Sequence, residues 1–209
     1  TPIRNFPHKD NKQEGAIEIF KMPEKDSSGK VFNGRYIAGC DPYDDDVADT
    51  MSLGSFFVFD LWTDKIVAEY TGRPTFADDF YEKCRLLCLF YNARLNYESN
   101  KKGLFAYFSK MNCLYLLTDV LDYLKDKDMV KGQLFGNKSK GTTATQAING
   151  YGRTLIRNWL ILPKTIIIND GEKDIESTTY NLNFIRSRAL LQELISYNPD
   201  GNFDRVSAL

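Results

Sequence analysis

The chain has 209 residues, of which 43% are hydrophobic and 26% charged, so it is long enough to fold around a sizeable core as one domain. No apolar run approaches the roughly 18 residues that a membrane span needs, and the first residues contain no apolar signal segment. The net charge of −1 excludes a basic field over the whole domain, so any nucleic-acid surface has to be a local patch.

The N-terminal half of the chain has the pattern of a small antiparallel sheet. Residues 1–15 are polar and mixed, and we expect them to be a frayed lead-in to a domain that spans 16–209. A short strand is expected at 16–21. Three stronger runs of apolar, aromatic and β-branched residues follow, at 35–40, 53–60 and 65–70. Because the turns between these three runs are short, we expect an antiparallel meander.

The next elements predict a crossover to a parallel strand. Apolar residues at helical spacing indicate a helix over 76–91, and the strand-like run 93–98 comes after it. A helix between two strands of one sheet favours a parallel arrangement, here of the fourth strand beside the first. A further helix at 104–111 and a fifth strand at 113–117 complete the expected α/β fold, a mixed five-stranded sheet flanked by helices.

The rest of the chain is expected to be mainly helical. The expected elements are a short helix at 118–124, a loop at 129–141, a long helix at 143–162, a hairpin or loop at 166–177, an amphipathic helix at 181–197 and the start of a helix at 202–209.

Cysteine and histidine usage argues against a zinc site. The four cysteines form no CxxC pair, and the single histidine is His8. Cys84 and Cys88 lie four residues apart in a helical pattern, which is typical of small core residues in a reduced, cytosolic protein.

Three acids stand where the predicted elements end or begin. Asp41 follows the first strand of the meander, Glu98 ends the fourth, and Asp204 stands near the start of the last helix. If the first and fourth strands are parallel neighbours, Asp41 and Glu98 leave the same sheet end about 4.8 Å apart. Such oxygen ligands suit Mg²⁺ or Mn²⁺, and a pair of ions can activate water and stabilise the leaving oxygen of a phosphodiester.

Structural roles explain the same acids without a metal. An acid at a strand end is often a turn residue, and Asp204 could serve only as a helix N-cap. The acidic run 44–46 fits a solvated loop better than a second metal site, whereas the role of Asp49 is open.

An ordered series of short motifs resembles the nuclease domain of the large terminase subunit of tailed bacteriophages, over roughly residues 17–209. In chain order the matching segments are Gly39-Cys40-Asp41, Asp49, the strand 53–60, Gly72-Arg73, Tyr91-Asn92, Glu98-Ser99-Asn100 with Gly103, Gly141-Thr142-Thr143, and Asp204 with Ala208. The resemblance implies an RNase H-like fold and a divalent-metal-dependent DNA endonuclease. Catalytic, metal-ligand roles follow for Asp41, Glu98 and Asp204, with Asp49 as a secondary ligand and two Mg²⁺ or Mn²⁺ ions.

The resemblance also implies partners and a place of action. The substrate would be concatemeric double-stranded DNA, cut in the host-cell cytoplasm during genome packaging with no membrane involved. An ATPase domain, a portal and a small terminase subunit would be the protein partners. The sequence contains no GxxxxGK[S/T] motif and begins at Thr1, so we expect it to be a piece that lacks the ATPase domain. Phe203 and Arg205 flank Asp204 where the family often has adjacent acids, which puts the second metal in doubt.

Phosphate contacts are expected from lysines and arginines near these motifs. The candidates for DNA binding are Lys101, Lys102, Lys138, Lys140, Arg186 and Arg188. Solvated surface charges are the alternative for each of them. For the whole chain, the alternatives are another RNase H-like nuclease, such as a Holliday-junction resolvase, and a catalytically silent module that docks on DNA or a portal.

Overall fold

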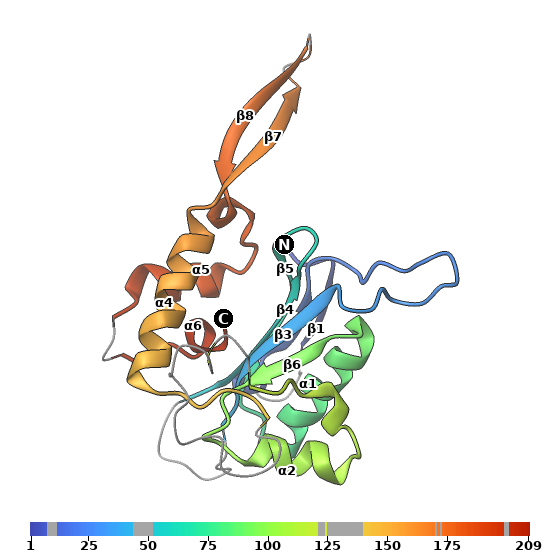
Figure 1. Cartoon of the computed structure of the whole chain (residues 1–209), viewed down its shortest axis with the longest axis vertical. Coiled ribbons are helices and arrows are strands. Elements are labelled where there is room, and N and C mark those ends of the chain that lie inside the picture. The colour runs from blue at the N-terminus through green and yellow to red at the C-terminus, as the bar shows by residue number, and fades with distance from the viewer. Residues whose placement is uncertain are drawn as a thin grey trace.

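The computed structural model describes residues 1–7, 12–43, 52–120, 124, 140–169, 171, 173–198 and 201–209. These residues form a six-stranded mixed sheet in the order β1-β2-β5-β4-β3-β6, together with a separate two-stranded hairpin and flanking helices (Figure 1). The strands of the large sheet are β1 (Arg4–Pro7), β2 (Ala16–Ile19), β3 (Tyr36–Asp41), β4 (Gly54–Asp60), β5 (Lys65–Gly72) and β6 (Arg94–Tyr97).

The predicted meander and the parallel strand are confirmed. β3, β4 and β5 pair antiparallel, with a short turn between β4 and β5, and β6 pairs parallel with β3 after the crossover helix α1 (Ala77–Tyr91). The helix ends at Asn92, which takes a left-handed conformation with φ 50°, and the chain then enters β6. This topology brings the C-terminal ends of β3 and β6 side by side.

The expected five-stranded count is wrong at both ends of the sheet. At the β5 edge two strands are added: β2, from the short strand expected at 16–21, pairs with β5, and β1, from within the expected lead-in, pairs with β2. The expected fifth strand at 113–117 is instead the 3-10 turn η2 (Leu114–Leu116), because its backbone closes local hydrogen bonds. Only Leu117 reaches the sheet, through a single parallel bridge to Leu95.

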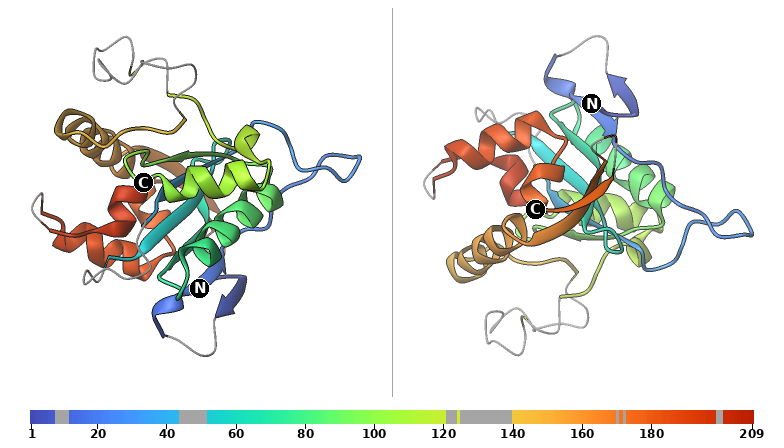
Figure 2. Two further views of the ribbon diagram at one scale, coloured as in Figure 1. Left: turned by 90° about the horizontal axis from the view of Figure 1, so that it is seen from below. Right: turned by 90° about the horizontal axis from the view of Figure 1, so that it is seen from above.

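Helices cover the two faces of the sheet (Figures 1 and 2). One face packs against α1 and carries the larger core, which also includes residues of α2 (Gly103–Lys110). On the other face, α6 (Asp204–Ala208) packs directly on β3 and β4 and contacts α5 (Arg188–Ser196). The helix α4 (Gln146–Leu160) lies on this side too, and none of its residues is buried.

The C-terminal region follows the expected order with changed boundaries. The predicted helix over 181–197 divides into η3 (Asn181–Phe184) and α5, because the Ser187 side chain accepts a hydrogen bond from the Leu190 backbone N–H and so caps a new helix. The region 166–177 belongs to the hairpin of β7 (Pro163–Asn169) and β8 (Asp174–Tyr180), which projects away from the sheet (Figure 1).

The short helix expected at 118–124 does not begin at its predicted start. Thr118, Asp119 and Val120 are not helical, since the Thr118 backbone N–H donates to Leu95 and Asp119 bridges to Lys140.

Within the described residues, no helix combines the length and the apolar character that crossing a membrane requires.

Candidate metal centre

Alternation along the strands decides which side chains reach the site. In β3, Tyr36, Ala38 and Cys40 enter the larger core, so Asp41 lies on the opposite face. In β6, Leu95 and Tyr97 enter the same core. Leu95 and Tyr97 pair with Ala38 and Cys40, so these four side chains lie on one face of the sheet. Residues 96 and 98 therefore lie on the opposite face, with Asp41.

The structure brings Asp41 and Glu98 together around one cation. The Glu98 backbone N–H donates to the Cys40 carbonyl oxygen at 3.1 Å, which places Glu98 beside the end of β3. The Lys101 ammonium donates to Asp41 Oδ1 at 2.6 Å and lies 3.5 Å from Glu98 Oε2. Both predicted acids thus share a single positive charge, which Lys101 supplies.

Burial and charge act in opposite directions on this cluster. The side chain of Asp41 is only 8% exposed, and burial raises its pKa to about 7, although the Lys101 charge lowers it and the neighbouring Glu98 raises it further. Burial lowers the pKa of Lys101, but attraction to Asp41 and Glu98 outweighs burial and leaves that pKa above its ordinary value. Lys101 is therefore a protonated ammonium at neutral pH.

Asp204 reaches the same end of the sheet but not the cluster. It is buried at the start of α6, and its two carboxylate oxygens accept hydrogen bonds from Ser52 Oγ at 2.8 Å and the Leu53 backbone N–H at 2.9 Å. Those residues lead into β4, the strand paired with β3. Within the described ranges, no group of three or more His, Cys, Asp or Glu side chains is arranged to hold a metal ion.

An ion-pair network fixes the helix that carries Asp204. Arg205 donates from Nε to Glu69 Oε1 of β5 and from Nη1 to Glu193 Oε1 of α5, both at 2.8 Å. The carboxylate of Glu193 also accepts the Arg205 backbone N–H at 2.9 Å. Gly39 of β3 admits α6 closely, because a Cβ there would lie 2.2 Å from the Ala208 carbonyl oxygen. The sequence offered no signal for Ser52, Glu69 or Glu193 in this role.

The carboxylate oxygens of Asp41 and Glu98 are suitable ligands for a hard divalent cation such as Mg²⁺. Asp41 and Glu98 are two carboxylates that already hold a positive charge, and Lys101 stands in for the ion. Asp204 is held by Ser52 and Leu53 instead of by Lys101, with one hydrogen bond to each of its carboxylate oxygens. The described residues therefore fit one ion held by two carboxylates.

The predicted phosphate contacts separate into two groups. Lys102 is exposed beside Lys101, and Lys140 lies on a segment that bridges to the end of β6, where Thr142 pairs with Glu98. The Lys140 ammonium is itself held by Asp119 at 2.8 Å and the Leu117 carbonyl oxygen at 3.1 Å.

The two arginines lie away from the acidic pair. Arg186 donates to the Phe20 carbonyl oxygen at 2.7 Å, and Phe20 is hydrogen-bonded to Val67, near the end of the sheet opposite Asp41. Arg188 is exposed at the start of α5. The secondary ligand Asp49, the acidic run 44–46 and Lys138 lie outside the described residues.

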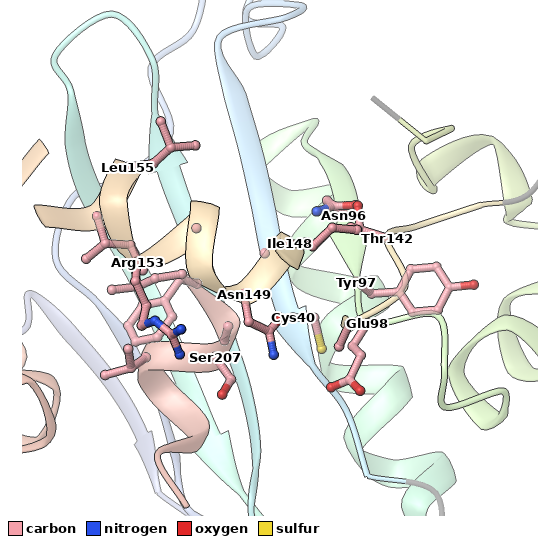
Figure 3. Close-up of a pocket in the computed structure, with 18 of the residues that line it drawn as sticks. Cys40, Asn96, Tyr97, Glu98, Thr142, Ile148, Asn149, Arg153, Leu155 and Ser207 are labelled. Carbon is pink, nitrogen blue, oxygen red and sulfur yellow. The ribbon is translucent and has the colours of Figure 1, made fainter. Parts of the chain in front are cut away.

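A cavity of about 490 Å³ opens between α4 and this face of the sheet (Figure 3). Its walls are mainly apolar, with Phe57 and Trp159 among them, and Glu98 stands at one side. Asn149 and Arg153 of α4 also line it, and Arg153 Nη1 donates to the Tyr197 hydroxyl at 3.3 Å. Space for a ligand therefore adjoins Glu98, one member of the acidic pair.

Comparison with known proteins gives limited information. No family model matches the sequence, and no curated protein matches it. One similar solved structure is described as "Crystal structure of the large terminase nuclease from thermophilic phage G20c", with 12% sequence identity, 97% of this chain and 88% of that chain covered, and a TM-score of 0.41. At that score and identity the likeness does not establish a shared function.

Proposed function

We propose that this chain is a divalent-metal-dependent nuclease that hydrolyses phosphodiester bonds of DNA, of the RNase H-like class. The observation that carries the proposal is the pair of Asp41 and Glu98, which leave parallel neighbouring strands and share one cation. Mg²⁺ or Mn²⁺ bound there would supply Lewis-acid stabilisation and a water of lowered pKa. The backbone hydrogen bond between Glu98 and Cys40 holds the two carboxylates in register for that ion.

A finer proposal concerns the substrate and the setting. The ordered motifs from Gly39 to Ala208 support a terminase-like endonuclease that cuts concatemeric double-stranded DNA during phage genome packaging, in the host cytoplasm. Its partners would then be an ATPase domain, a portal and a small terminase subunit. Two ions in the reaction would require Asp204 as a further ligand, and its oxygens already accept hydrogen bonds from Ser52 and Leu53.

Cleavage of a supercoiled plasmid with Mg²⁺ or Mn²⁺, with and without EDTA, tests the proposal. Asp41→Asn is expected to lower the cleavage rate roughly 100-fold or more, because several kcal/mol of transition-state stabilisation depend on the bound ion. Asp78→Asn, which changes an exposed carboxylate on α1, is the matched control and should cleave at the parent rate. Equal cleavage by the Asp41 variant and the parent would reject the assignment.

A catalytically silent docking module is the second candidate. It is favoured by the neutralising Lys101 and by the engagement of both Asp204 oxygens. This candidate predicts that calorimetry detects no Mg²⁺ or Mn²⁺ binding at the Asp41 site. Preference for a four-way junction over linear duplex in the cleavage assay would instead indicate a resolvase.

A further inference from the structure

Lys101 has contacts that a simple phosphate-binding lysine does not need. Its ammonium donates to Asp41 at 2.6 Å and lies within ion-pair distance of Glu98 at 3.5 Å. Lys101 lies in the short connection between β6, which ends at Tyr97, and α2, which begins at Gly103. The connection is therefore held at both ends by regular secondary structure. Its side chain is 30% exposed, against 8% for Asp41 and 23% for Glu98, so it is the most exposed of the three.

We propose that Lys101 is a built-in counter-ion that keeps Asp41 and Glu98 together in the metal-free protein and that an incoming divalent cation has to displace. The inference rests on the proposed function, since it concerns the same two carboxylates. A monovalent ammonium and a divalent ion cannot occupy one position between the same oxygens. The metal affinity of the site is therefore a difference between two sets of contacts rather than the strength of one set.

Position explains why the exchange is possible. The ammonium is attached to a flexible four-carbon stem, and its part-exposed side chain gives it a path into solvent without a change in the backbone. The backbone of Asp41 is fixed by the β3 ladder and that of Glu98 by its hydrogen bond to Cys40, so the backbone at both residues stays in place when the lysine leaves. Exchange of the cation thus needs only one side chain to move.

Removal of the lysine charge should strengthen metal binding. In Lys101→Met, Mg²⁺ no longer competes with an ammonium, and we expect its dissociation constant to fall at least about tenfold, equivalent to about 1.4 kcal/mol. Calorimetric titration with Mg²⁺ alone, at a pH above the raised pKa of Asp41, measures this change. Lys102→Met is the matched control, because it removes the same charge one residue away, and its affinity should stay within about twofold of the parent.

A second measurement covers the case in which Lys101→Met is poorly folded. Without metal, that variant should unfold at a lower temperature than the parent, because the two carboxylates lose their counter-ion, and Mg²⁺ should raise its midpoint by more than that of the parent. Lys101→Arg keeps the charge, and its Mg²⁺ affinity should stay closer to that of the parent than to that of the Met variant.

The outcomes separate this inference from the proposed function. Equal Mg²⁺ affinity of Lys101→Met and Lys102→Met, with Asp41→Asn still weakening binding, would overturn the counter-ion role and leave the metal site intact. Absence of Mg²⁺ binding by every protein would overturn both proposals. Tighter binding in Lys101→Met that disappears in the double variant with Asp41→Asn would support both.

Discussion

The two faces of the central sheet are built in different ways. The face toward α1 holds a closed core in which Phe80 is fully buried and contacts the rings of Tyr43, Tyr70 and Tyr81. The face toward α4 has a smaller core, a cavity of about 490 Å³ and the acidic pair at its edge. One face thus stabilises the fold, while the other presents polar groups and open space where a ligand can enter.

The largest expected effect contrasts the two faces directly. Phe80→Ala should lower the free energy of unfolding by about 3–5 kcal/mol, because it leaves a large void in a closed core. Leu155→Ala, at a residue of α4 that lines the cavity and is 44% exposed, should cost less than about 1 kcal/mol. Urea denaturation measures both values. Similar losses in the two variants would show that the α4 face is as tightly packed as the other.

The next effect concerns the charge at the edge of the open face. Because the pKa of Asp41 is raised to about 7 in the folded state, its protonated form stabilises the fold. That stability is complete below the ordinary carboxyl pKa near 4 and is lost as pH rises through about 7. Without metal, the stability of Asp41→Asn relative to the parent should therefore rise by about 4 kcal/mol between pH 4 and pH values above 7.

Denaturation curves of both proteins across that pH range provide the measurement. Asp78→Asn is the control, since its exposed carboxylate should give a difference that hardly depends on pH. A difference between parent and Asp41→Asn that is the same at acid and alkaline pH would contradict the burial of an ionisable group at this position.

A smaller effect is expected where α6 meets the sheet. Gly39→Ala places a methyl group 2.2 Å from the Ala208 carbonyl oxygen, so the helix has to move. We expect a loss of about 1–3 kcal/mol in unfolding free energy. In the proposed nuclease the displaced Asp204 would also lower cleavage. Full stability in this variant, measured by thermal unfolding, would mean that α6 is not in close contact with β3.

The smallest expected effect is a gain in stability, on the face of the sheet that α4 covers. Gly152 lies within α4 at the cavity, and a Cβ there would meet nothing within 4 Å. Gly152→Ala should therefore stabilise the protein by about 0.5–1 kcal/mol, because alanine loses less backbone freedom in a helix. The thermal unfolding midpoints of Gly152→Ala, Gly39→Ala and the parent, measured together, test whether the cavity is open space. A lower midpoint for Gly152→Ala than for the parent would indicate that the cavity is filled.

The part of the fold that the sequence predicts correctly is the part with clear local patterns of apolar residues. The runs of apolar, aromatic and β-branched residues at 35–40, 53–60 and 65–70 and the helix over 76–91 were sufficient to predict the meander and the parallel neighbour, and hence the meeting of Asp41 with Glu98. The β1 strand was missed because four residues ending at Pro7 give no usable period. The prediction of a fifth strand was wrong because the backbone at Leu114–Leu116 forms local 3-10 hydrogen bonds instead of pairing with a strand.

Long-range contacts limited the prediction of the site. The engagement of Asp204 by Ser52 and Leu53 joins residues about 150 positions apart, and no local pattern signals it. Lys101 was expected to bind phosphate, although its spacing of three from Glu98 was visible in the sequence as an ion-pair signal. The ion pair with Asp41 depends on the register of β3 and β6, which only the folded chain reveals.

The anchoring of Arg205 has a consequence for how many carboxylates the site can offer. Its guanidinium joins α6 to Glu69 of β5 and to Glu193 of α5, and the backbone of α6 presses on Gly39. Asp204 is the neighbouring residue, so it cannot approach Asp41 by a simple rotation of its own side chain away from Ser52 without leaving the Leu53 N–H unpaired. A larger approach would have to move α5 and α6 together, so in the proposed nuclease the position of this helix pair would decide whether the ion has two carboxylate ligands or three.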